Sequence, residues 1–165
     1  MRPRSFIPLS LLLFACAGLA DGPQVVGWVE YARIYPGKML FFAKLDTGAY
    51  SSHINARNVQ PFEKDGEPWV RFNIVNRANR SMPLELPLAR EVTVKLEEGE
   101  REQRPSVWLG ICVAGVYKKA LVSLDDRDDF LYPLLIGRKY LKGRFAVDPS
   151  LKFQTKPNCE VGDDG

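Results

Sequence analysis

Residues 45–52 read LDTGAYSS, and an acid stands there at the point where an apolar run breaks into a glycine turn. The preceding run, MLFFAKL, predicts a β-strand, and Gly48 lets the chain turn where a Cβ would clash. A carboxylate in this place is held at the end of a strand, within reach of the Thr47 hydroxyl and the Gly48 amide. We therefore interpret Asp46 as a candidate catalytic group whose loop is supported by Thr47, Gly48 and Ala49. The same tripeptide also fits an ordinary Asx-type turn, which is the structural alternative.

A second segment strengthens the catalytic interpretation. Residues 133–141 read PLLIGRKYL, an apolar strand that ends in Gly-Arg before a short helical patch. Both segments, in this order, resemble the retropepsins. The resemblance implies that the strand with Ile136, Gly137 and Arg138 lies beside the Asp-Thr-Gly loop and supports it. We expect Arg138 to pair with a carboxylate near the axis of a dimer, for example in the region of residues 127–129.

Length and composition limit what these motifs can mean. The chain has 165 residues, of which 45% are hydrophobic, and this predicts one compact domain, placed at residues 25–149. Basic residues are scattered, and the formal net charge falls from +3 to +1 when a leader with Arg2 and Arg4 is removed. We therefore expect no nucleic-acid partner, because that would need a clustered basic face.

The first twenty residues predict a signal peptide. Two arginines precede an apolar run from Phe6 to Ala20, which ends in small residues before Asp21 and is short for a permanent membrane span. Cleavage after Ala20 and lipid attachment at Cys16, in a lipobox-like sequence, are both open. Either outcome predicts an exported, periplasmic protein, soluble or held to a membrane by a lipid.

Cysteine and histidine are too sparse for a metal site. Besides Cys16, the chain has Cys112, Cys159 and one histidine, His53, without the spacing of zinc ligands. The two cysteines allow one disulfide or two free thiols. His53 is more readily a partly buried structural residue than a catalytic one. The acidic loop at residues 125–129 lacks a calcium-loop pattern and is expected to be solvated.

The remaining pattern predicts a mainly β fold. Short alternating runs are separated by turns at Tyr35 to Lys38, Asp65-Gly66, residues 97–100 and Ala114-Gly115, with one helical patch at residues 138–142. Many short strands with close turns favour a closed barrel or a sandwich. Residues 150–165 are expected to form a polar, partly loose tail.

From Gly27 to Pro149 the chain resembles a retropepsin-like bacterial family named for ATP-dependent zinc proteases. The resemblance rests on KLDTGA at residues 44–49, SSHINA at 51–56, PWVRF at 68–72, RP at 104–105, RDD at 127–129 and LIGR at 135–138. It implies a retropepsin-like closed barrel and peptide-bond hydrolysis. Neither a phosphate-binding loop nor a zinc motif is present in the sequence, so we expect no ATP, metal or other cofactor.

A single Asp-Thr-Gly per chain carries a mechanistic requirement. Aspartic proteolysis needs two carboxylates that share one proton, so the resemblance implies a homodimer with Asp46 of each chain at a two-fold axis and a peptide or protein substrate. Since Ala49 offers no hydroxyl to the carboxylate, we expect the pair to keep its proton to higher pH.

The flap over the substrate has two candidates. Counting back from residues 135–138 favours the hairpin tip at Glu98 and Gly99 over the hairpin at Asp65-Gly66. Two other functions stay open: a non-catalytic module that binds peptide or cell wall, and a metal-dependent hydrolase.

Overall fold

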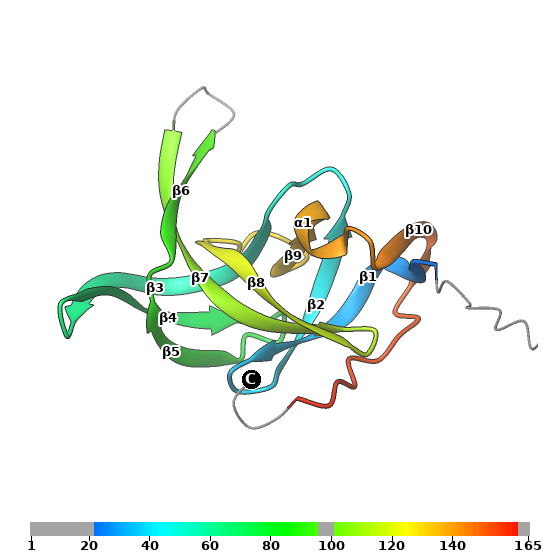
Figure 1. The fold of residues 1–165 in the computed structure, drawn as a ribbon, viewed down its shortest axis with the longest axis horizontal. Coiled ribbons are helices and arrows are strands. Elements are labelled where there is room, and N and C mark those ends of the chain that lie inside the picture. Colours follow the sequence, from blue (N-terminus) through cyan, green and yellow to red (C-terminus); the bar gives the residue numbers. More distant parts are fainter. Residues whose placement is uncertain (1–21, 96–100, 162–165) are drawn as a thin grey trace, which may run out of the picture.

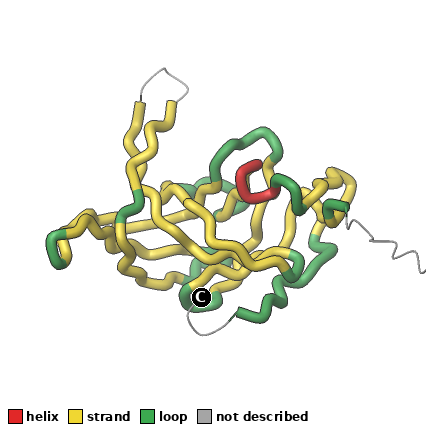
Figure 2. Tube along the Cα trace, in the orientation of Figure 1, coloured by secondary structure: helices red, strands yellow, loops and turns green. Residues whose placement is uncertain are grey.

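The computed structural model describes residues 22–95 and 101–161, which form ten strands and one short helix. Figure 2 shows that strands dominate. The elements are β1 (Gln24–Tyr35), β2 (Met39–Asp46), β3 (Ser52–Lys64), β4 (Glu67–Val75), β5 (Ser81–Pro87), β6 (Arg90–Lys95), β7 (Arg101–Val113), β8 (Val116–Asp125), β9 (Leu134–Gly137), α1 (Arg138–Leu141) and β10 (Phe145–Lys152).

Six of these strands close into a barrel. Strands β1, β2, β9, β3, β8 and β7 pair in that order, and β7 then pairs with β1 to complete the circle. Strand β10 extends β1, while β4 and β5 extend β3 as a second sheet. The prediction of a mainly β, closed barrel with one short helix after the Ile-Gly-Arg strand is confirmed.

Alternation along the barrel strands decides what lies inside. Residues such as Ala43, Leu45, Ile54, Ile136 and Leu109 point inward and are almost fully buried. Their neighbours in sequence point to the other face, because successive side chains of a strand alternate. Burial of these inward residues therefore fixes the register of the strands. The outward side chains are not needed for the core.

Two hairpins project from the barrel. Figure 1 shows the arms of β6 and β7 standing away from it, with β3 and β4 reaching out elsewhere. The turn at Asp65-Gly66 is confirmed, and both residues have positive φ. The proposed flap tip, Glu98 and Gly99, lies outside the described residues, so only the arms of that hairpin are seen.

The C-terminal segment differs from the loose tail that the sequence suggests. Strand β10 runs past residue 149 and pairs in parallel with the start of β1. Beyond it, Cys159 forms a disulfide with Cys112 of β7, which decides between the two alternatives for these cysteines. The polar composition was misleading because backbone pairing and a covalent link, rather than apolar side chains, hold this segment.

A buried carboxylate completes the attachment of the tail. Glu30 is fully buried in β1, and its Oε1 accepts hydrogen bonds from the amides of Gly27, at 2.7 Å, and Gln154, at 3.1 Å. Its Oε2 accepts from the amide and the hydroxyl of Thr155, at 3.0 and 2.9 Å. Each oxygen is thus satisfied twice, as a buried carboxylate requires.

We predict that Glu30→Ala lowers the free energy of unfolding by about 3 kcal/mol or more, because it leaves several buried donors without an acceptor. Urea unfolding measures the change. Glu30→Gln keeps one acceptor oxygen and should cost less than Glu30→Ala. A loss below about 1 kcal/mol for Glu30→Ala would show that Glu30 does not hold the tail.

Candidate active site

Asp46 is the last residue of β2 and stands beside β9. The two strands are parallel, and Asp46 is the register partner of Gly137. A Cβ at residue 137 would collide with the Ser51 backbone, so glycine lets the loop after β2 fold against the end of β9. The Gly137 amide also donates to the Ser52 hydroxyl, at 3.2 Å. The end of β9 therefore lies against Asp46 and the segment that follows it.

Both oxygens of the Asp46 carboxylate have partners in the single chain. Oδ1 accepts from the amides of Gly48, at 2.8 Å, and Ala49, at 3.2 Å, while Oδ2 lies 3.0 Å from Lys44 Nζ. Burial raises the pKa of this carboxyl, but Lys44 and the two amides together outweigh burial and lower it. The side chain keeps 22% of its surface exposed, so the ionised group still faces outward.

Lys44 is a part of the site that our sequence reasoning missed. It precedes Asp46 by two residues, and this spacing on a strand puts both side chains on one face. That spacing was a usable signal, because Lys44 is the polar interruption in an otherwise apolar strand.

Arg138 supports the loop, but not through the ion pair we expected. Its Nη1 donates to the carbonyls of Thr47, at 2.9 Å, and Gly48, at 2.7 Å. The expectation of a carboxylate near residues 127–129 is wrong in the single chain. The loop carbonyls turn toward Arg138 because the Arg138 amide also bonds the Ala49 carbonyl, at 2.8 Å.

Four of the five strands next to Asp46 place a polar side chain on the outer face, and β9 places Leu135 there. The register runs from Lys44 to Leu135, then to His53, Ser123 and Ser106. Ser123 and Ser106 are buried, and their hydroxyl oxygens are 3.0 Å apart. These polar side chains lie on the face opposite the core, and the two buried serine hydroxyls satisfy each other there.

A charged cluster follows on the same face. Asp125 Oδ1 lies 2.6 Å from Arg104 Nη1, and Asp125 Oδ2 lies 3.6 Å from Arg127 Nη1 and 3.8 Å from His53 Nδ1. The other ring nitrogen of His53 is 3.1 Å from the Ser51 hydroxyl. His53 is partly buried, as predicted, but the cluster joins residues far apart in sequence and could not be assembled from spacing.

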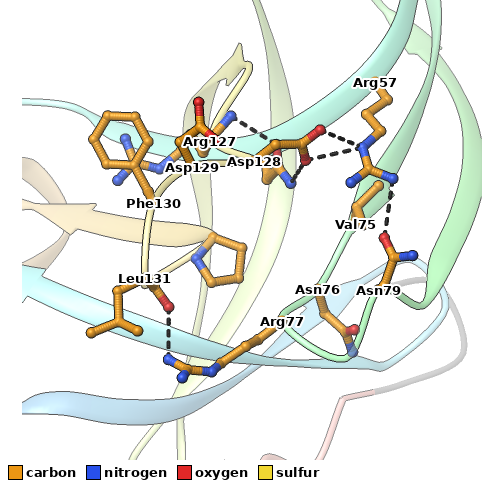
Figure 3. A pocket seen from close by; sticks show the side chains of 12 residues that line it. Arg57, Val75, Asn76, Arg77, Asn79, Arg127, Asp128, Asp129, Phe130 and Leu131 are labelled. Carbon is orange, nitrogen blue, oxygen red and sulfur yellow. Dashed lines mark hydrogen bonds and ion pairs between the residues drawn. The ribbon is translucent and has the colours of Figure 1, made fainter.

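The acidic loop is exposed at Asp126, Asp128 and Asp129, as expected of a solvated loop, and hydrogen bonds also hold it. Asp128 accepts from Arg57, at 2.8 Å, and from Asn55, at 2.9 Å, and Arg57 also donates to Asn79, as Figure 3 shows. These residues line a pocket of about 330 Å³. Among residues 22–95 and 101–161, no group of three or more His, Cys, Asp or Glu is arranged to hold a metal ion.

The chain matches one protein family over most of its length. The family is described as retropepsin-like aspartic endopeptidase RimB, and the match covers residues 25–158. The chain belongs to the RimB-like family. The zinc-protease name expected from the sequence is thereby corrected. Neither the family nor the relatives below carry that name.

This RimB-like chain resembles both longer proteins and a solved structure. Proteins from Shewanella pealeana and Shewanella halifaxensis, each named probable alpha-L-glutamate ligase, are 31% identical over 140 residues, which is 82% of this chain and 30% of theirs. The chain thus spans less than a third of the curated relatives it matches. A solved Legionella pneumophila protein of unknown function is 34% identical with a TM-score of 0.69, covering 80% of this chain and 98% of that one.

We predict that Lys44→Met raises the pKa of Asp46, because it removes the cation that stabilises the charged form. Carboxyl-carbon NMR titration measures the pKa, with Asp46→Asn to assign the signal. Lys38→Met removes an exposed cation elsewhere and should leave the Asp46 pKa in place. An unmoved Asp46 pKa in Lys44→Met would mean that the ion pair does not form in solution.

We also predict that His53 makes the RimB-like domain less stable in mild acid. Burial lowers its pKa, Asp125 opposes this, and Arg127 and Arg104 lower it further. The unfolded chain then binds the proton more readily, so the neutral ring's contribution is full above about pH 6.5 and falls as pH drops toward the folded-state pKa. Urea midpoints measured across this range should vary less in His53→Asn than in the wild type. If the urea midpoints of both proteins changed equally with pH, the assignment of this pH dependence to His53 would be contradicted.

Proposed function

We propose that this protein is an aspartic endopeptidase that hydrolyses peptide bonds with Asp46. One observation carries the proposal: the Asp46 carboxylate is fixed at a strand end by the Gly48 and Ala49 amides and still faces outward. In the reaction, one ionised aspartate takes a proton from water, the water oxygen attacks the peptide carbonyl, and a protonated aspartate donates its proton toward the carbonyl oxygen. The C–N bond of the intermediate then breaks as the aspartate that took the proton from water gives it to the leaving nitrogen, which releases the amine.

The proposal requires two chains. In one chain Lys44 and two amides favour the charged form of Asp46, so this group is suited to act as the base and not as the acid. A second Asp46 across a two-fold axis would raise one pKa of the pair by like-charge repulsion and hold the proton. Thr47 is exposed beside Asp46, and in such a dimer its hydroxyl would bond the partner loop. The absence of a hydroxyl at Ala49 was expected to let the Asp46 pair keep its proton to higher pH. Lys44 acts in the opposite direction, because it favours the charged form of Asp46.

The β6–β7 hairpin would serve as the flap of this enzyme. Its arms stand away from the barrel (Figure 1), and Arg104 of β7 pairs with Asp125 on the polar outer face. A substrate held between this hairpin and that face would be shielded from bulk water. This arrangement favours the β6–β7 hairpin over β3–β4 in that role.

We further propose that the peptide substrates include α-linked glutamate. The support is the name of the longer relatives, probable alpha-L-glutamate ligase, in which a region similar to this chain accompanies further sequence. Lys44, Arg104 and Arg127 lie on the face that carries Asp46 and already pair with Asp46 and Asp125, so a glutamate carboxylate bound there would join an existing network of charges.

Export to the periplasm completes the proposal. The apolar leader of residues 1–20 supports it, as does the Cys112–Cys159 disulfide, since such bonds persist in oxidising compartments. Lipid attachment at Cys16 remains the alternative to cleavage after Ala20. A non-catalytic peptide-binding module on the same fold is the second candidate function, and the relative's ligase name leaves room for it.

Digestion of a peptide library, including glutamate-rich peptides, tests the proposed activity. Asp46→Asn should lower cleavage by about a hundredfold to ten-thousandfold, because it removes the proton chemistry and keeps the shape. A chelator should leave the wild-type rate unchanged. Equal cleavage by both proteins would refute Asp46 catalysis, peptide binding without cleavage would support the binding module, and chelator inhibition reversed by zinc would support a metal hydrolase.

A further inference from the structure

A group of basic side chains surrounds α1, outside the polar face just described. Residues 138–144 read RKYLKGR, with four cations and no acid. Arg138 is engaged by the Asp46 loop, whereas Lys139, Lys142 and Arg144 are exposed. On β8, two more lysines join them. We define the basic patch as Lys118, Lys119, Lys139, Lys142 and Arg144.

The positive charge of the basic patch is not balanced. Lys118 Nζ donates to the Lys139 carbonyl, at 3.3 Å. Burial lowers the pKa of Lys118, and the charges that act on it, from Arg144 and Lys139, are both cationic and lower it further. Within the part of the chain that the structure describes, no patch residue takes part in an ion pair. Such a surface is stabilised by an external anion.

Exposed aromatic residues border the basic patch on two sides. Trp108 is 57% exposed and lines a hollow of about 120 Å³ with Lys118, Lys119 and Lys139. Tyr50 is 62% exposed and lines a second hollow, of about 520 Å³, with Lys139 and Lys142. Large rings beside lysines are typical of a surface that meets the boundary between water and lipid.

The start of the domain lies at the same place. The Gln24 amide bonds the Arg144 carbonyl, at 2.8 Å, and Gln24 pairs with Phe145. From Ala20, the end of the apolar leader, four residues reach Gln24 and span at most about 14 Å; from Cys16 the limit is about 28 Å. An apolar leader or a lipid at Cys16 would therefore be joined to the domain beside Arg144.

We propose that the basic patch docks the domain onto the surface of an anionic lipid bilayer, with Trp108 and Tyr50 in the interfacial layer. The charge surplus and the exposed rings fit an anionic headgroup region, and the leader joins the domain at the patch. An acidic peptide could use the charge but gives no role to the two rings or to the position of Gln24. Docking does not use the Asp46 carboxylate, although Thr47 and Arg138 beside that carboxylate also line the hollow at Tyr50.

Sedimentation with vesicles tests the proposal. Residues 22–161 contain every strand named above and the buried core, so a chain beginning at Asp21 serves as the protein. It should bind phosphatidylcholine vesicles that contain phosphatidylglycerol, and not pure phosphatidylcholine, at about 0.1 M salt. Changing Lys118, Lys139, Lys142 and Arg144 to Gln should weaken binding about tenfold or more.

A matched control removes four exposed cations elsewhere, Lys38, Arg80, Arg90 and Lys156, again by change to Gln. This variant should bind vesicles much more tightly than the patch variant. A second readout is the fluorescence emission of Trp108, which should shift to the blue when vesicles are added. The Trp108→Phe variant should not show this shift. Equal binding by the two charge variants, no binding by the wild type, or saturation of the patch by a glutamate-rich peptide that displaces the vesicles would overturn membrane docking.

Discussion

The close approach of Gly137 to the Ser51 backbone is the constraint on which the site depends. It lets the chain leave β2 at Asp46, fold back over the end of β9 and enter β3. Arg138, the next residue, then reaches the loop carbonyls, and the loop amides turn toward the Asp46 carboxylate. A side chain at residue 137 would separate the loop from β9 and remove these contacts together. The position of Asp46 is thus a consequence of backbone packing.

The two faces of the barrel strands have different roles: the inner face forms the core, and the outer face carries the candidate site. Inward residues such as Leu45 and Ile136 form the core, while Lys44 and Asp46, on the outward face of β2, belong to the candidate site. Period-two alternation made the strands, the turns and the barrel predictable from the sequence, because it depends on local residue order. The charged cluster of Asp125, Arg104 and Arg127 was not predictable, because strand pairing across the barrel brings these residues together.

At the site itself, the sequence located the loop but not its electrostatics. The Asp46 carboxylate accepts from the Gly48 amide, a contact that LDTGA suggests, and also from the Ala49 amide, since both contacts are local. Lys44 was overlooked although its spacing from Asp46 was visible, and Arg138 was given the wrong partner because carbonyl acceptors leave no trace in side-chain patterns. The tail was misjudged for a related reason: its attachment relies on backbone donors to Glu30 and on a disulfide.

Mixing wild type with Asp46→Asn in rising proportion, under conditions that allow subunits to exchange, tests most directly whether Asp46 works in pairs. If cleavage needs Asp46 from both chains, activity follows the square of the wild-type fraction, and an equal mixture retains about a quarter of the wild-type rate. A linear fall, with about half the rate in the equal mixture, would show that one chain suffices and would contradict the paired-aspartate account.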